Sequence, residues 1–542
     1  MLDRNILSEK YFTRQKIVQH HVDSFNDFLE YGMQQVVDEL GTIDTDIGKT
    51  GEEGAPIERA HVKLGKIRVG YPVVKEADGA VDVLYPNDAR LRNVSYAAPI
   101  YLEMSIVRTT DYGVTEDDPV EVEIGSMPIM LMSNACNMYN LSADELAKFG
   151  EDPMDPGGYF IINGTERVIM TLEDLVPNKI LTEYGERYGD PIQVAKVFSE
   201  RQGYRALVVV ERGRNSLLEV SFPSSSGRLN FITLLRALGL DSDEDITNAI
   251  SDDTDIMPFI YENLEEVEKF KSGPREGEPI MTHEDAMEAI GKKVATGQTD
   301  EYRDKRASYV LDRYLLPHLG NHESTRLLKA HYLARMAEAC FELVLNKRGQ
   351  DDKDHYANKR LKLSGHLLED LFRVSFNRLA KDFKYQLERS HMRNRELNVK
   401  TAVRVDVLTQ RLLQPLATGN WVGGRSGVAQ LLDRIDYISS LSHLRRVISP
   451  LSRTQPHFEA RDLHATQWGR LCPSETPEGP NCGLVKNFAQ LVELSTGVFN
   501  VDGTRDILFD SGVKPVIDPA LYVSHLHDPL NPDFITEGGD NE

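Results

Sequence analysis

The chain has 542 residues, 27% of them charged, and a formal net charge of −23 at pH 7. This length predicts several domains rather than one core, and the near-average composition predicts that most of the chain folds. The sequence has no run of eighteen apolar residues and no apolar signal region at its start, so we expect no membrane-spanning segment and a cytoplasmic location.

The charge is distributed unevenly. Residues 353–470 contain 21 Lys/Arg and 11 Asp/Glu, whereas residues 241–270 contain eleven acidic residues and one lysine. A basic stretch on an acidic body can bind a polyanion locally while the protein stays soluble. The overall acidity also fits a protein from a salty cytoplasm. The four cysteines, Cys136, Cys340, Cys472 and Cys482, form no CxxC pair, which excludes a disulfide scaffold and disfavours a structural zinc site.

The first part of the chain predicts a helix followed by strands. Apolar residues recur at spacings of three and four from residue 18 to Leu40, which predicts one amphipathic helix that ends at Gly41. Ser142 and Glu145 have the spacing of a capping box and predict a short helix. Alternation of apolar and polar residues predicts strands over 62–71, 91–108 and 119–132.

Residues 157–170, GGYFIINGTERVIM, predict a hairpin. Asn163-Gly164 separates two apolar runs, and Asn-Gly is the strongest short signal for a two-residue turn. A plain hairpin explains the turn, and Arg167 beside Glu166 is a candidate for contact with a partner.

Residues 177–350 change in character, and we interpret them as an insertion with a core of its own. The acidic run from Asp241 to Phe270 is typical of a solvated face. The patterns predict strands near 193–211 and 217–222, and helices over 231–238 and 325–346.

After DDKDHYANKRLKLSGHLLEDLFR (351–373) we expect a helix to about Met392. This helix carries four basic residues: Arg373, Arg378, Lys381 and Lys384. The excess of positive over negative residues continues into the loops beyond the helix, which favours a phosphate-facing surface over merely solvated charge. ATGNW (417–421) and GGRSGVAQLLDRIDYISSLSHLRR (423–446) follow.

The stretch Arg461 to Asn487, RDLHATQWGRLCPSETPEGPNCGLVKN, is the most distinctive part of the chain. Three prolines restrict its backbone and three glycines permit unusual dihedral angles. A shaped loop that carries Arg470, Glu475 and Glu478 favours a functional role over a linker, because flexible linkers are simple in composition.

Together these motifs resemble the second-largest subunit of multisubunit DNA-directed RNA polymerases. The matching stretches occur in the family's order. The amino-acid sequence of the last stretch, 461–487, is closer to archaeal and eukaryotic members than to bacterial ones. Because the family subunit is about twice as long, the sequence resembles the N-terminal half (B″) of a split archaeal subunit; a truncated longer chain would read the same.

The resemblance implies an α+β multidomain fold with the parts of an RNA polymerase beta-like subunit. The implied segments are an N-terminal arm (1–19), a protrusion (20–176 and 351–416), an inserted lobe (177–350), a fork (417–490), and the start of an external domain with a polar tail (491–542).

The resemblance also implies that this chain is an inactive part of a nucleotidyltransferase. The reaction needs two divalent metals held by clustered carboxylates. We find no Asp-x-Asp-x-Asp cluster in a glycine-bearing loop here, and interpret Asp44–Asp46 and the acids near Asp241 as solvated surface. The family places Mg²⁺ on the largest subunit. The expected partners are that subunit, the C-terminal half (B′), DNA template, RNA transcript and general transcription factors.

By similarity, a set of residues lines the nucleic-acid channel of the fork. We expect Gln430 and Asp433, three residues apart, to share one face of a helix. Arg453, in the loop 452–460, is a candidate to clamp a template phosphate or stack on a base. The full channel set is Gln430, Asp433, His443, Arg445, Arg446, Arg453, Arg461 and Arg470. In bacterial relatives this region binds rifamycins, but Tyr437, Leu444 and Ile448 depart from that pattern.

A second set is expected to shape the fork loop: Trp468, Glu475, Pro477, Glu478, Gly479 and Asn481. Carboxylates repel phosphate unless they are paired, so we interpret Glu475 and Glu478 as ion-pair partners of Arg461 or Arg470. Trp468 and His464 are interpreted as the core of the loop, and Phe458 as either a wedge or local packing.

Two other classes of function stay open. One is a free-standing nucleic-acid-binding protein or polymerase regulator with the same fold, which would not co-purify with larger subunits. The other, an NTP-driven remodeller, lacks a G-x-x-x-x-G-K-[ST] motif.

Overall fold

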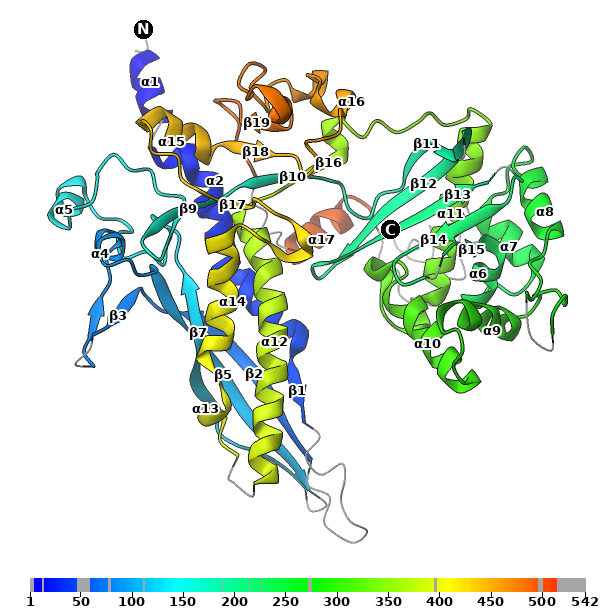
Figure 1. Ribbon diagram of the computed structural model, residues 1–542, viewed down its shortest axis with the longest axis horizontal. Helices are drawn as coiled ribbons and strands as arrows, with labels where there is room; N and C mark the ends of the chain where they lie inside the picture. Colours follow the sequence, from blue (N-terminus) through cyan, green and yellow to red (C-terminus); the bar gives the residue numbers. More distant parts are fainter. Residues whose placement is uncertain are drawn as a thin grey trace. The chain divides into compact units, whose positions relative to one another are not determined.

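The computed structural model describes residues 4–11, 14–45, 59–76, 79–110, 113–187, 189–213, 215–225, 227–271, 275–393, 397–495 and 501–513. The chain divides into two compact units, both of mixed α+β structure (Figure 1). The first comprises Met1–Asp174 and Lys359–Val498, and the second Leu175–Asn358 and Phe499–Glu542.

The first unit begins with helices. The predicted amphipathic helix is confirmed, with one interruption by a π-turn at Phe28–Gly32. It ends at Gly41, whose φ of 61° suits glycine. The N-terminal helices are α1 (Arg4–Tyr11), α2 (Arg14–Asp27) and α3 (Met33–Leu40).

An antiparallel sheet forms the body of the first unit. Its strands follow the order β1-β2-β5-β6, and β7 pairs with the other part of the long β5. The predicted strand over 91–108 starts too early, because Leu91 ends a short helix, and Tyr71 lies beyond β2. The bounds are β1 (Thr42–Asp44), β2 (Arg59–Val69), β3 (Val73–Lys75), β4 (Val81–Val83), α4 (Pro86–Leu91), β5 (Ala97–Thr110), β6 (Gly113–Glu116) and β7 (Val120–Pro128).

Two long helices pack beside this sheet, as Figure 1 shows for α12 and α14. Apolar side chains of both helices join the core that α2, α3 and the sheet also line, so residues before 140 and after 364 close one domain. The closest approach is at Gly365, where an added Cβ would lie 1.9 Å from the Ser24 carbonyl oxygen. The helices are α12 (Ser364–Met392), α13 (Val399–Ala402) and α14 (Val405–Thr418).

The predicted hairpin and capping box are both confirmed. β8 (Phe160–Ile162) and β9 (Thr165–Ile169) flank Asn163 and Gly164, whose φ values of 49° and 75° match a type I′ turn. Ser142 caps α5 (Ala143–Lys148) reciprocally with Glu145.

The second unit has its own hydrophobic core. Its sheet is an antiparallel meander, in which two strands around a turn at Gln202-Gly203 occupy the stretch 193–211. The strands are β11 (Leu181–Arg187), β12 (Asp190–Arg201), β13 (Tyr204–Arg212), β14 (Leu218–Ser221) and β15 (Leu229–Asn230). The helices are α6 (Phe231–Ala237), α7 (Asp243–Ile250), α8 (Met257–Glu265), α9 (His283–Val294), α10 (Asp300–Arg313), α11 (Arg326–Val344) and α17 (Val501–Asp510). The two predicted helices correspond to α6 and α11.

Candidate nucleic-acid interface

A small sheet in the first unit supports the candidate interface. Its strand order is β16-β10-β18-β19, from β16 (Lys359–Lys362), β10 (Thr171–Leu175), β18 (Arg446–Ile448) and β19 (Val485–Asn487). Within this sheet, the buried carboxylate of Glu173 accepts hydrogen bonds from the ammonium groups of Lys359 (2.8 Å) and Lys486 (2.9 Å). This triad joins three strands that are distant in sequence.

Gln430 and Asp433 do not share a helix, so that prediction is wrong. Gln430 lies in β17 (Ala429–Leu431), which pairs with β9, and Asp433 lies in the turn before α15 (Tyr437–Leu444). The imidazole of His443 nevertheless brings them together, because its Nδ1 accepts from the Asp433 N–H (3.0 Å) and its Nε2 lies 3.2 Å from Gln430 Oε1. Burial lowers the pKa of His443 to about 4, so the ring is neutral near pH 7.

Arg445 is turned toward the protein. Its guanidinium donates to the carbonyl oxygens of Ile17 (3.1 Å) and Ala489 (2.7 Å), and burial lowers its pKa. Arg446, on β18, is half-buried. Arg445 therefore ties α2 to the segment after β19.

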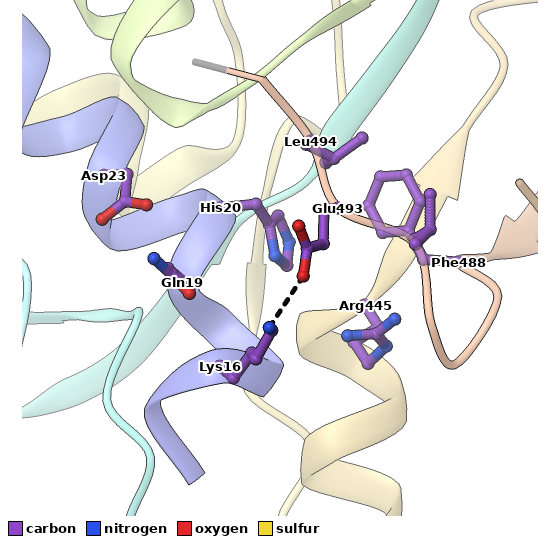
Figure 2. Close-up of a pocket in the computed structure, with 9 residues that line it drawn as sticks. Lys16, Gln19, His20, Asp23, Arg445, Phe488, Glu493 and Leu494 are labelled. Carbon is purple, nitrogen blue, oxygen red and sulfur yellow. Dashed lines mark ion pairs between the residues drawn. The ribbon is translucent and has the colours of Figure 1, made fainter. Parts of the chain in front are cut away.

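Arg445 also lines a cavity of about 210 Å³ between α2 and that segment (Figure 2). The Lys16 ammonium and the Glu493 carboxylate form an ion pair of 2.7 Å at this cavity. The lining residues are Lys16, Gln19, His20, Asp23, Arg445, Phe488, Val492, Glu493 and Leu494.

The loops after β18 present a different set of side chains to solvent. Arg453 and Arg470 are exposed, and so are Phe458 (77%) and Trp468 (86%). The interpretation of Trp468 as loop core is therefore wrong, and local packing does not account for Phe458. His464 is half-buried and its Nδ1 contacts the Thr466 hydroxyl (2.7 Å).

Arg461 holds these loops in shape from within. Its guanidinium donates to the carbonyl oxygens of Pro456 (2.7 Å), Pro480 (2.8 Å) and Cys482 (2.8 Å). Gly483 lies against it, since an added Cβ would be 2.4 Å from the Arg461 carbonyl oxygen. A single side chain thus joins α16 (Phe458–Arg461) to the turn after Glu478.

The predicted ion pairs of Glu475 and Glu478 are not formed. Among the residues described, neither carboxylate pairs with Arg461 or Arg470; Arg470 instead donates to the Thr466 carbonyl oxygen (2.7 Å). Glu475 accepts a hydrogen bond from the Ser442 hydroxyl (2.5 Å), which links the loop to α15. Pro477 lies two residues before Gly479. Gly479 has a φ of 75° and begins a short 3₁₀ helix that ends at Asn481.

Arg434, which no sequence pattern indicated, anchors the segment between β17 and α15. Its guanidinium donates to Glu166 (2.7 and 3.1 Å), Asp155 (3.0 Å) and the Tyr159 hydroxyl (3.0 Å). Glu166 also accepts from Arg90 (2.8 Å). Burial by itself would raise the pKa of Glu166, but these two arginines outweigh it and lower the pKa. An isolated arginine before a helix cap carries no sequence signal for this role.

The charged residues of α12 separate into two groups. Arg373 is buried and pairs with Glu39 (2.8 Å) and Glu369 (2.7 Å). The prediction that Arg373 belongs to a phosphate-facing surface is therefore wrong. Arg378 and Lys381 are exposed on the helix, as is Tyr385 one turn further on.

Within the described part of the chain, no three His, Cys, Asp or Glu side chains gather as a metal site would require. No described helix is both long enough and apolar enough to cross a membrane. Asp44 is exposed, and Asp46 lies outside the described residues.

Comparison with known proteins assigns most of the chain. Residues 16–410 match the family described as RNA polymerase beta subunit, and residues 430–494 match RNA polymerase Rpb2, domain 3. The DNA-directed RNA polymerase subunit Rpo2N of Halobacterium salinarum is 60% identical over 513 residues, which cover 93% of this chain and 94% of that protein.

Rpo2N of Methanocaldococcus jannaschii is 50% identical over 90% of this chain and 95% of its own length. The Rpo2 subunit of Saccharolobus shibatae is 47% identical over 94% of this chain, an alignment that covers 43% of that longer protein.

Proposed function

Because this chain belongs to the beta-subunit family of DNA-directed RNA polymerases, and within it to the archaeal Rpo2N type, we propose that it builds part of the wall around the transcription bubble. The chemistry of nucleotide addition then lies elsewhere in the assembly. We expect Mg²⁺ on the largest subunit, and the C-terminal half of the split subunit, DNA, RNA and general transcription factors as partners.

The proposal includes a division of the chain into a protrusion (20–176 and 351–416), an inserted lobe (177–350), a fork (417–490), an N-terminal arm (1–19) and the start of an external domain (491–542). The two compact units support it, since they separate at 174/175 and 358/359, close to the proposed ends of the lobe. Two separate hydrophobic cores give the same support.

One observation carries the proposed role of the fork: Arg453 and Arg470 are exposed on loops that also expose two large aromatic rings. Burial in a partner or stacking on bases is the ordinary reason for an aromatic ring to be this exposed, and arginine supplies the phosphate contact beside it. We assign the contact with nucleic acid to Arg453, Phe458, Trp468 and Arg470.

The other residues of the predicted channel set then support this surface from behind. Arg461 holds the loops, and His443, which lies in α15, joins Gln430 to Asp433. Arg445 braces α2 against the segment that follows β19, while the half-buried Arg446 lies on β18.

The test uses a polymerase reconstituted with Arg453→Ala or Arg470→Ala in this chain. Assembly should be normal, while open complexes dissociate faster and the slope of log affinity against log salt falls by about one per arginine removed. Lys305→Ala removes an equal charge from an exposed position on α10 in the second unit and serves as the matched control. Wild-type lifetimes at every salt concentration in both arginine variants would contradict the assignment.

A further inference from the structure

A groove in the second unit lies outside the surface assigned to nucleic acid. It runs between α7 and α8 and encloses about 500 Å³. Met257, Tyr261 and Leu264 contribute its apolar floor from one face of α8, at spacings of four and three. The Tyr261 side chain is 52% exposed although its neighbours on that face are buried or half-buried. The groove is therefore open to an apolar group from outside.

Carboxylates border this apolar floor. Asp243 and Glu244 lie in the first turn of α7 and Glu265 in the last turn of α8. Asp243 is paired with Arg236 (2.6 Å), but within the described residues no cation forms an ion pair with Glu244 or Glu265. Glu265 also opposes the dipole of its own helix. Its charge therefore does not stabilise α8, and a cation from outside would relieve this repulsion.

We propose that the α7–α8 groove docks a basic amphipathic segment of another protein. One aliphatic or aromatic side chain of that segment lies on Met257, Tyr261 and Leu264, and flanking lysines or arginines meet Glu244 and Glu265. Charge complementarity selects this occupant: eleven acidic residues within 241–270 repel nucleic acid. The same repulsion disfavours residues 514–542 of this chain, which contain six acidic residues and one lysine.

The groove can be tested with a labelled helical peptide that has leucine on one face and lysine on the other. Fluorescence anisotropy would measure its binding to the full chain, with the same peptide carrying glutamate in place of lysine as the probe control. The double variant Glu244→Lys/Glu265→Lys should weaken binding at least about tenfold, and Tyr261→Ala about fivefold. Hydrogen exchange in α7 and α8 should slow when the peptide binds.

The matched control is Asp241→Lys/Glu262→Lys, which makes the same change in charge on exposed residues of the same acidic stretch that do not line the groove. It should weaken binding less than twofold. If both double variants lost the same amount of peptide affinity, the binding would depend only on the overall negative charge of the stretch, and the proposal would be overturned. Self-association of the chain that only the groove variant abolishes would assign the groove to a second copy, which also overturns it. Neither result bears on the fork.

Discussion

Replacing Arg434 with alanine tests whether the segment that leads into α15 is held by one side chain. The substitution removes four hydrogen bonds, two to Glu166 and one each to Asp155 and the Tyr159 hydroxyl. None of the partners is left alone, because Glu166 keeps Arg90 and Asp155 keeps the Tyr159 hydroxyl (2.6 Å). The Arg434 side chain is also 41% exposed, so solvent screens its charge. The net loss should be about 2 kcal/mol.

Hydrogen exchange measured by mass spectrometry gives the local readout. A loss of about 2 kcal/mol should speed exchange about 30-fold in residues 430–440, without a comparable change in the second unit. Arg434→Lys keeps the charge but not the branched donor geometry, and should fall between wild type and Arg434→Ala.

Arg404→Ala is the matched control. Arg404 is 57% exposed and makes a single 3.3 Å contact with Asp382, so its loss should change exchange by about twofold or less. If Arg434→Ala and Arg404→Ala gave the same exchange pattern, the reasoning that Arg434 anchors this segment would be refuted.

The other predictions concern the hairpin, the buried imidazole and the buried triad. Gly164→Val should lower soluble yield sharply, because its Cβ would lie 2.6 Å from Asn93 Oδ1 at a positive φ. Gly423→Ala, which also has a positive φ but open space around it, should lower the free energy of unfolding by only about 1–2 kcal/mol, and equal yields of the two variants would contradict this. The pKa of His443 is about 4 in the folded state against an ordinary 6.5, so its contribution to stability is complete above pH 6.5 and is lost as pH falls toward 4. His443→Gln should therefore reduce the dependence of the free energy of unfolding on pH between 4 and 6.5, measured by urea denaturation at a series of pH values, and an unchanged dependence would contradict this. Glu173→Ala removes the buried carboxylate that both Lys359 and Lys486 contact, and it should destabilise the first unit by about 3–5 kcal/mol, measured by the denaturation midpoint. Lys63→Ala, which removes an exposed partner of Glu116, should have little effect.

Local elements of the fold could be predicted from the sequence where the signal is local. The helix ending at Gly41, the Asn163-Gly164 turn, the Ser142 cap and helices α6, α11 and α12 each depend on residues a few positions apart, and all six are confirmed. The early start given to the strand at 91 shows the limit. Leu91 belongs to a helix that begins at a proline, and apolar alternation does not distinguish that helix from a strand.

The environment of the candidate interface could not be predicted, because it depends on contacts between distant segments. Nothing near Arg461 in sequence indicates that it binds the carbonyl oxygens of Pro480 and Cys482 instead of a carboxylate. Gln430 and Asp433 have helical spacing, but pairing of β17 with β9 prevails over that local pattern. Whether Trp468 is buried depends on segments distant in sequence, and its own loop gives no indication that the ring is exposed.

The four-stranded sheet β16-β10-β18-β19 has a consequence for biosynthesis. Its four strands come from residues 171–175, 359–362, 446–448 and 485–487, and β10 pairs in parallel with β18. While a ribosome extends the chain, residues 175–358 can collapse into their own globule early, but the edges of β10 stay unpaired until β16 and β18 have emerged. An open strand edge recruits other polypeptides. Nascent chains of this protein therefore pass through an aggregation-prone interval, which lasts at least until synthesis has passed β18.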